Sequence, residues 1–132
     1  MEITISKEDV IQLLTNYYKK TEGFTGTIQI ITEKDFDGYG YYGSKKEIAK
    51  TKIERKEEMN LYGITVPVVS ALTKTEVLGV FQNILSEKGY SVNSIGFDQG
   101  ITTEYHYNDD YKVAYCNGLK LDVEKQVKEY RR

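Results

Sequence analysis

Residues 73–89 read TKTEVLGVFQNILSEKG, and this stretch contains the signals of both ends of an amphipathic helix. Thr73 and Glu76 have the spacing of a capping box, in which each side chain satisfies a backbone amide at the helix start. Glycine readily adopts the left-handed backbone conformation in which helices commonly end, so Gly89 is a plausible helix stop. The stretch therefore predicts a helix over about residues 74–88. Its apolar stripe, spaced as a buried helix face requires, is Val77, Leu78, Val80, Phe81, Ile84 and Leu85.

Similar signals occur near the start of the chain. Ser6 stands three residues before Asp9, and apolar residues, among them Leu14 and Tyr17, follow at helical spacing. These features predict a helix over about residues 7–21. When the two helices are aligned on their caps, polar and apolar positions match along both. This match indicates an internal repeat.

The repeat continues beyond the helices. Each helix is followed by a run rich in β-branched residues and then by a segment rich in Gly, Tyr and Asp, which we interpret as a loop. A hairpin is predicted next in both halves, turning at Tyr62-Gly63 and at Asn117-Gly118. Asn-Gly is a preferred pair for a tight type I′ turn. The predicted fold class is α+β, with two αβββ halves produced by internal duplication and two helices packed on antiparallel sheet.

The repeat also sets the expected domain organisation. Residues 1–132 are predicted to form a single domain, built from repeat-like halves at 5–71 and 72–123. Residues 124–132 are rich in charged side chains, so we interpret them as a charged C-terminal tail.

Residues 45–58 allow two interpretations. Ser44 and Glu47 have the spacing of a capping box, which would start a helix. Ala49, Thr51 and Ile53 alternate with Lys50 and Lys52, however, and this alternation favours an exposed strand. Residues 61–72 are its predicted partner strand. Pro67 has no amide hydrogen, so we expect it on a sheet edge or at a bulge.

Composition restricts the function. The chain has 132 residues, of which 39% are hydrophobic and 29% are charged, which suits one domain with its own core. The formal net charge is −2, so no overall positive field attracts nucleic acid. No apolar run approaches the roughly 18 residues that cross a bilayer, and no secretion signal is visible at the N-terminus. We therefore expect a cytosolic protein that binds neither nucleic acid nor a membrane.

Two ligand-binding motifs occur in incomplete form. Residues 38–43 read GYGYYG and fit the spacing of a dinucleotide-binding loop, but the flanking strand and helix are not indicated. Asp35 and Asp37 resemble the start of a calcium loop, yet Lys46 stands where that loop requires glutamate. We expect no metal and no cofactor. The alternative function is a small-molecule or nucleotide binder in which aromatic rings of loop 38–43 stack on a base.

Cys116 and His106 are the candidates for nucleophilic catalysis, provided that two strands place them face to face. A small packed cysteine and a surface histidine explain the same residues without catalysis. The single cysteine also excludes an internal disulfide. We expect no catalytic residue, and a Cys116/His106 hydrolase is the weaker alternative.

The most distinctive stretch runs from Gly89 to Tyr111. It contains no lysine or arginine, and acidic residues alternate there with aromatic ones. Tyrosine gives large contact area with few rotatable bonds, so this mixture is typical of protein-binding loops. Tyrosines that pack on a sheet, and acids that keep the protein dissolved, are the alternative explanation. The predicted binding residues are Asp98, Glu104, Tyr105, Tyr107, Asp109 and Asp110, together with Tyr39, Tyr41 and Tyr42 in the first half.

The run KGYSV at 88–92, which leads to GFDQG at 96–100, resembles small uncharacterised proteins of bacterial mobile elements and phages. The resemblance covers most of residues 60–123 and implies no catalytic residue. It implies a protein that binds and blocks a host protein, with carboxylates placed where that host protein accepts phosphates. We therefore expect a non-enzymatic protein-binding module directed at a host defence or nucleic-acid-handling protein. The oligomeric state stays open.

Overall fold

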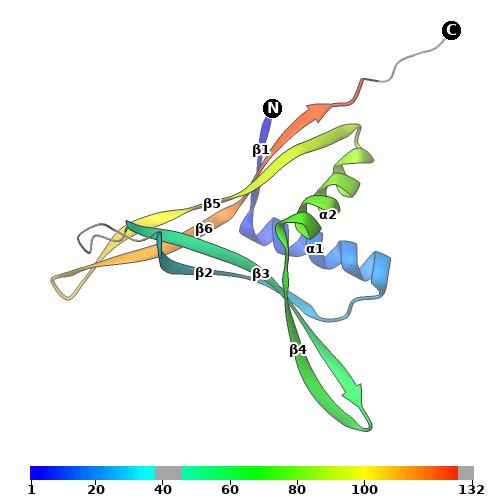
Figure 1. Ribbon diagram of the computed structural model, residues 1–132, viewed down its shortest axis with the longest axis horizontal. Helices are drawn as coiled ribbons and strands as arrows, with labels where there is room; N and C mark the ends of the chain where they lie inside the picture. Colours follow the sequence, from blue (N-terminus) through cyan, green and yellow to red (C-terminus); the bar gives the residue numbers. More distant parts are fainter. Residues whose placement is uncertain (38–45, 128–132) are drawn as a thin grey trace.

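The computed structural model describes residues 1–37 and 46–127 (Figure 1). Within them the chain forms β1 (Glu2–Ser6), α1 (Lys7–Glu22), β2 (Thr27–Asp37), β3 (Lys46–Leu61), β4 (Ile64–Leu72), α2 (Lys74–Ser86), β5 (Tyr90–His106) and β6 (Asp109–Lys125). The predicted α+β class, with two helices packed on antiparallel sheet, is confirmed.

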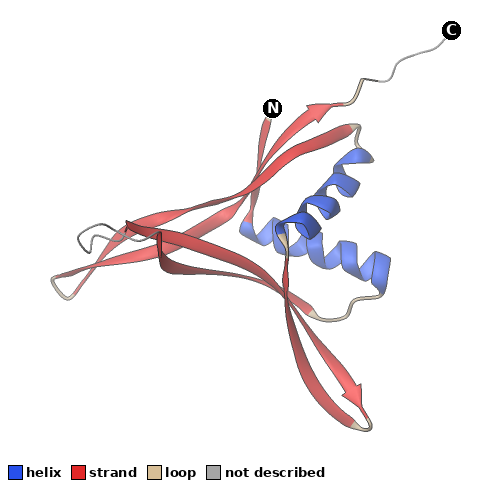
Figure 2. Cartoon of the chain, in the orientation of Figure 1, coloured by secondary structure: helices blue, strands red, loops and turns tan. Residues whose placement is uncertain are grey.

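The strands form two antiparallel sheets of three strands each. Their orders are β1-β6-β5 and β2-β3-β4. Figure 2 shows that the two sheets diverge at one end and that both helices lie in the angle between them. The hydroxyl of Thr51 on β3 donates a hydrogen bond to Gln99 Oε1 on β5, which ties one sheet to the other.

The core lies where the helices meet both sheets. Leu14, Val77 and Phe81 are buried as predicted, and three other residues of the predicted stripes pack against the core while partly buried, namely Tyr17, Ile84 and Leu85. The sheets contribute inward side chains on alternate positions, as strand geometry requires, except in β5, where a register shift separates Val92 from Ile95 by three positions. These buried sheet residues are Ile28, Ile30, Ile53, Val92, Ile95, Leu119, Leu121 and Val123.

Both helices start at their predicted caps. Ser6 Oγ accepts a hydrogen bond from the amide of Asp9 at 3.2 Å. The capping box is complete, because Thr73 Oγ1 accepts from the Glu76 amide at 3.1 Å and Glu76 Oε1 accepts from the Thr73 amide at 3.3 Å. α2 ends at Ser86, two residues before the predicted end.

The strand interpretation of residues 45–58 is confirmed over the described part, because β3 pairs with both β2 and β4. The hairpin predicted at Tyr62-Gly63 is also confirmed. Tyr62 has φ 52° and Gly63 has φ 85°, the positive values of a two-residue type I′ turn. Pro67 lies in β4, an edge strand, as expected for a residue without an amide hydrogen.

The hairpin predicted at Asn117-Gly118 is wrong. β5 and β6 form one long hairpin that turns at Tyr107 and Asn108. Opposite Asp98 and Gln99 the register shifts, which leaves Asn117 as an extra bulged residue. Gly118 has φ 148°, and a Cβ built on it would lie 1.9 Å from the carbonyl oxygen of Ile5. In the Asn-Gly pair, Asn117 therefore forms the bulge and Gly118 allows β1 to approach closely.

This correction changes the second half of the predicted repeat. α2 is followed by two strands, and the third strand of their sheet is β1, which precedes α1. The acidic, aromatic stretch from Gly89 to Tyr111 is not a loop but comprises the whole of β5, the turn and the start of β6. That residues 5–71 and 72–123 superpose as a duplication stays a prediction. Of the predicted tail 124–132, Glu124 and Lys125 belong to β6.

Candidate functional site

Five of the predicted binding residues lie together at the free end of the β5–β6 hairpin. We call residues 104–111 the tyrosine tip. Figure 1 shows this end projecting away from the helices. Tyr107 and Asn108 form the turn, and the strand residues on either side pair as Glu104 with Tyr111, Tyr105 with Asp110 and His106 with Asp109.

The acids of the tyrosine tip are divided between its two faces. Side chains alternate along a strand, so Glu104, Asp109 and Tyr111 share one face with His106. On that face His106 Nε2 lies 3.4 Å from Glu104 Oε2, and the imidazole ring lies 6.2 Å from the Tyr111 ring. The opposite face holds Tyr105 and Asp110. Each face therefore combines a tyrosine with carboxylate charge.

Tyr107 stands at a turn position where the backbone conformation does not favour a tyrosine. Its side chain is 97% exposed, and its φ of 53° is in the left-handed region. Asn, Asp and Gly are preferred at the first position of a type I′ turn, because a bulky side chain is strained there. The ring contributes no packing that would offset this strain. Backbone strain that the fold does not use is typical of functional positions.

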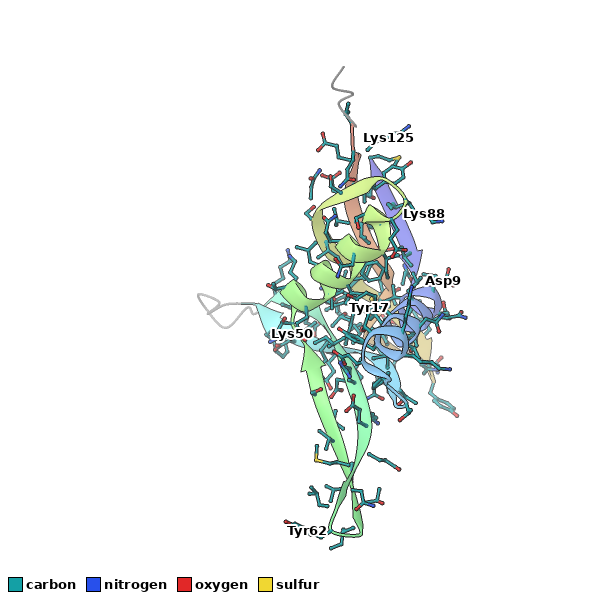
Figure 3. All side chains as sticks on the ribbon, turned by 90° about the vertical axis from the view of Figure 1, so that its right-hand side faces the viewer. Asp9, Tyr17, Lys50, Tyr62, Lys88 and Lys125 are labelled. Carbon is teal, nitrogen blue, oxygen red and sulfur yellow. The ribbon has the colours of Figure 1, made fainter. Side chains whose placement is uncertain are left out.

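Tyr62 repeats this arrangement at the end of the β3–β4 hairpin. Its φ is 52°, its side chain is fully exposed and Gly63 completes the turn. Figure 3 shows Tyr62 at the far end of that hairpin. Sequence reasoning identified the turn but not the tyrosine as a functional candidate. The available signal was an aromatic residue at the first position of a predicted two-residue turn.

Asp98 does not join the tyrosine tip. It lies at the bulge in β5, where its side chain is 25% exposed and its Oδ1 is 3.6 Å from Lys120 Nζ. Glu104 lies six positions further along β5, a distance of roughly 20 Å at the usual rise per residue. The prediction that Asp98 acts together with the other acids is therefore corrected. Tyr39, Tyr41 and Tyr42 lie outside the described residues.

Cys116 and His106 do not face each other. Cys116 lies opposite Gln99, whereas His106 lies opposite Asp109, and the alternation of side chains puts them on opposite faces of the hairpin. The Cys116 thiol donates to the carbonyl oxygen of Gly118 at 3.4 Å. The proposed nucleophile and base are thus roughly 20 Å apart along the strand.

Arg55 is the centre of a charged cluster that sequence reasoning missed. Its guanidinium lies 4.2 Å from the centre of the Tyr18 ring and 4.7 Å from that of Phe24. It also pairs with Glu22 at 2.9 Å and with Glu57. Burial lowers the pKa of Arg55, but hydrogen bonds to the two carboxylates outweigh this effect and raise it overall. Burial has the opposite effect on Tyr18: it raises the pKa of the phenol, and the positive charge of Arg55 only partly offsets this rise.

This geometry predicts a structural role for Arg55. Arg55→Met keeps an apolar stem but removes the cation over the rings, so we expect the free energy of unfolding to fall by about 1–2 kcal/mol. Lys56→Met is the control, because Lys56 is exposed on the other face of β3, and a change within about 0.5 kcal/mol is expected. Urea unfolding measures both. Equal stability of wild type and Arg55→Met would show that the cluster stabilises nothing.

Asp35, the first acid of the incomplete calcium motif, lies in a strand. It belongs to β2, where Oδ1 accepts from the Phe36 amide at 2.8 Å and Oδ2 lies 3.6 Å from Lys50 Nζ. Across the described residues, no three His, Cys, Asp or Glu side chains gather as metal ligands would. Neither of the two described helices is both long enough and apolar enough to cross a membrane.

Comparisons of the chain with protein-family models, with curated proteins and with solved structures found no match.

Proposed function

We propose that this protein is a non-enzymatic binding module that recognises a protein partner through the tyrosine tip. The observation that carries the proposal is Tyr107, which is fully exposed at a strained turn position where its ring does nothing for the fold. Tyr105 and Tyr111, 78% and 50% exposed, extend the aromatic surface along the two faces of the hairpin. Rigid aromatic side chains of this kind are frequent anchors of protein interfaces.

The carboxylates define the partner's chemistry. Glu104, Asp109 and Asp110 lie at the tip without a lysine or arginine within 4 Å among the described residues. Their charge attracts a basic surface over a distance and speeds encounter, whereas the tyrosines slow dissociation after contact. A basic groove that normally holds phosphates fits this chemistry. The proposal therefore includes a cytosolic host defence or nucleic-acid-handling protein as the target, blocked by a phage or mobile-element protein.

Tyr107→Asn separates binding from folding. Asn is favoured at this turn position, so the variant is expected to be as stable as wild type or slightly more stable, while partner binding weakens at least about tenfold through faster dissociation. Tyr62→Asn makes the same change in the other type I′ turn, so it shows whether the loss of binding belongs to the tyrosine tip or follows from removing either turn tyrosine. Affinity capture from bacterial lysate with each protein as bait, followed by surface binding of the captured partner, gives both rates.

Charge variants test the steering role. Changing Glu104 to Gln and both Asp109 and Asp110 to Asn should slow association at low salt, and the difference from wild type should fade at high salt. Asp98→Asn is the control, since Asp98 is held by Lys120 away from the tip. Capture that survives both the Tyr107 and the charge variants would contradict the proposal. Loss of binding on changing Tyr39, Tyr41 and Tyr42 would instead favour the small-molecule or nucleotide binder at loop 38–43.

A further inference from the structure

The β3–β4 hairpin has an exposed apolar face that the fold does not use. We call Met59, Leu61, Ile64, Val66 and Val68 the apolar hairpin face. The register pairs Met59 with Val66 and Leu61 with Ile64, so these side chains point to the same side. Ile64 is 67% exposed, and Met59 and Leu61 are about half exposed. None of the five belongs to the core or packs against it.

The hairpin projects from the molecule with this face open. Figure 3 shows its outer part extending beyond both helices, with Tyr62 at the end. The opposite face carries mainly polar and charged residues, such as Lys56, Glu58 and Asn60. The hairpin is therefore amphipathic, and its outer part leaves the apolar side uncovered as well as the polar one. The exposed apolar area, with Tyr62, is roughly 500 Å², near the upper end of the largest patch that a typical monomer exposes, and such patches are often functional.

The scarcity of unpaired charge on the apolar hairpin face indicates which partner can bind there. β4 contains no charged residue from Ile64 to Leu72. On the apolar side the nearest carboxylate, that of Glu57, is paired with Arg55. Two copies can therefore approach through this face without like-charge repulsion. The tyrosine tip, with its three carboxylates, would repel its own copy.

Pro67 indicates how two copies would meet. The pair Leu61 and Ile64 flanks a two-residue turn and is hydrogen-bonded, so Thr65, Pro67 and Val69 direct their backbone groups toward the free edge of β4. Pro67 has no N–H to offer there, which interrupts edge-to-edge pairing. The edge is thus protected, while the apolar face is not.

We propose that two copies of this chain form a symmetric dimer by packing their apolar hairpin faces against each other. A two-fold axis brings the same residues together from both copies, so one self-complementary patch suffices. The contact buries roughly 1,000 Å² in total, near the lower limit for specific interfaces, and we expect a dissociation constant in the micromolar range. The inference goes beyond the proposed function, because it uses a different hairpin and a different partner.

Sedimentation velocity of the full chain from low micromolar to near-millimolar concentration tests the dimer. Wild type should move from 15.2 kDa toward twice that mass, and high salt should not weaken the dimer. Ile64→Lys should weaken self-association at least about tenfold. Val69→Lys is the matched control, since Val69 is 49% exposed on the opposite face of the same strand and should leave the dimer intact.

Several results would overturn the proposal. A wild-type chain that stays at monomer mass at every concentration excludes the dimer. A dimer that persists in Ile64→Lys, or that is lost in Val69→Lys, excludes this face as its interface. Hydrogen exchange of the paired β3 and β4 amides in both variants tests whether the mutated hairpins remain folded. Tyr107→Asn should dimerise as wild type does, which keeps this test independent of partner binding.

Discussion

Phe81→Ala is expected to lower the free energy of unfolding by about 3–5 kcal/mol. Phe81 is completely buried on α2, within the cluster where both helices meet the inner faces of both sheets. Removing the ring loses its transfer free energy and leaves a cavity between elements that the surrounding strands hold apart. Urea denaturation followed by circular dichroism measures the change.

A control on the same helix isolates the burial effect. Thr75 lies in the first turn of α2 with its side chain exposed, so Thr75→Ala should change stability by no more than about 0.5 kcal/mol. Loss of less than about 1 kcal/mol in Phe81→Ala would mean that the ring does not fill the core. In that case the helical stripe would have to face a partner instead.

The helices could be predicted because their signals are local. Capping residues lie within four positions of each other, and the apolar stripe repeats within one segment. β3 could also be predicted, because Ala49, Thr51 and Ile53 alternate with Lys50 and Lys52. In each case the residues that decide the structure are neighbours in the sequence.

The pairing of β1 could not be predicted, because it depends on residues at the other end of the chain. Ile3 pairs with Leu121 and Ile5 with Leu119, more than 100 positions apart. Once β1 occupies that edge, Gly118 must accept a backbone that approaches from outside the hairpin. Asn-Gly is a turn signal in isolation, and this non-local contact overrides it.

The candidate site could be predicted in part for a geometric reason. Tyr105, Tyr107, Asp109 and Asp110 are close in sequence, and the turn at Tyr107 and Asn108 folds them back onto one another. Asp98 would join them only if the intervening residues folded back as a loop. β5 is extended there, and an extended chain separates residues by about 3.3 Å per position. The outer strands also lack a buried face, so no alternating pattern indicated their length.

Gly118→Ala is expected to destabilise the protein by about 3 kcal/mol or more. The φ of 148° is a conformation that alanine rarely adopts, and the added methyl would lie 1.9 Å from the Ile5 carbonyl oxygen. Only a shift of β1 or of β6 relieves this contact. Because Ser6 is both the last residue of β1 and the cap of α1, that shift also disturbs the start of the helix.

Gly96→Ala is the matched control in the same sheet. A Cβ at Gly96 meets no heavy atom within 4 Å, so that variant should match wild-type stability to within about 1 kcal/mol. Hydrogen exchange distinguishes local detachment of β1 from a general loss of stability. Gly118→Ala should deprotect the β1 amides that pair with residues 118–122, while the β3 amides near Ile53 stay protected. Equal stability of the two variants would contradict the close approach of β1 to the bulge in β6.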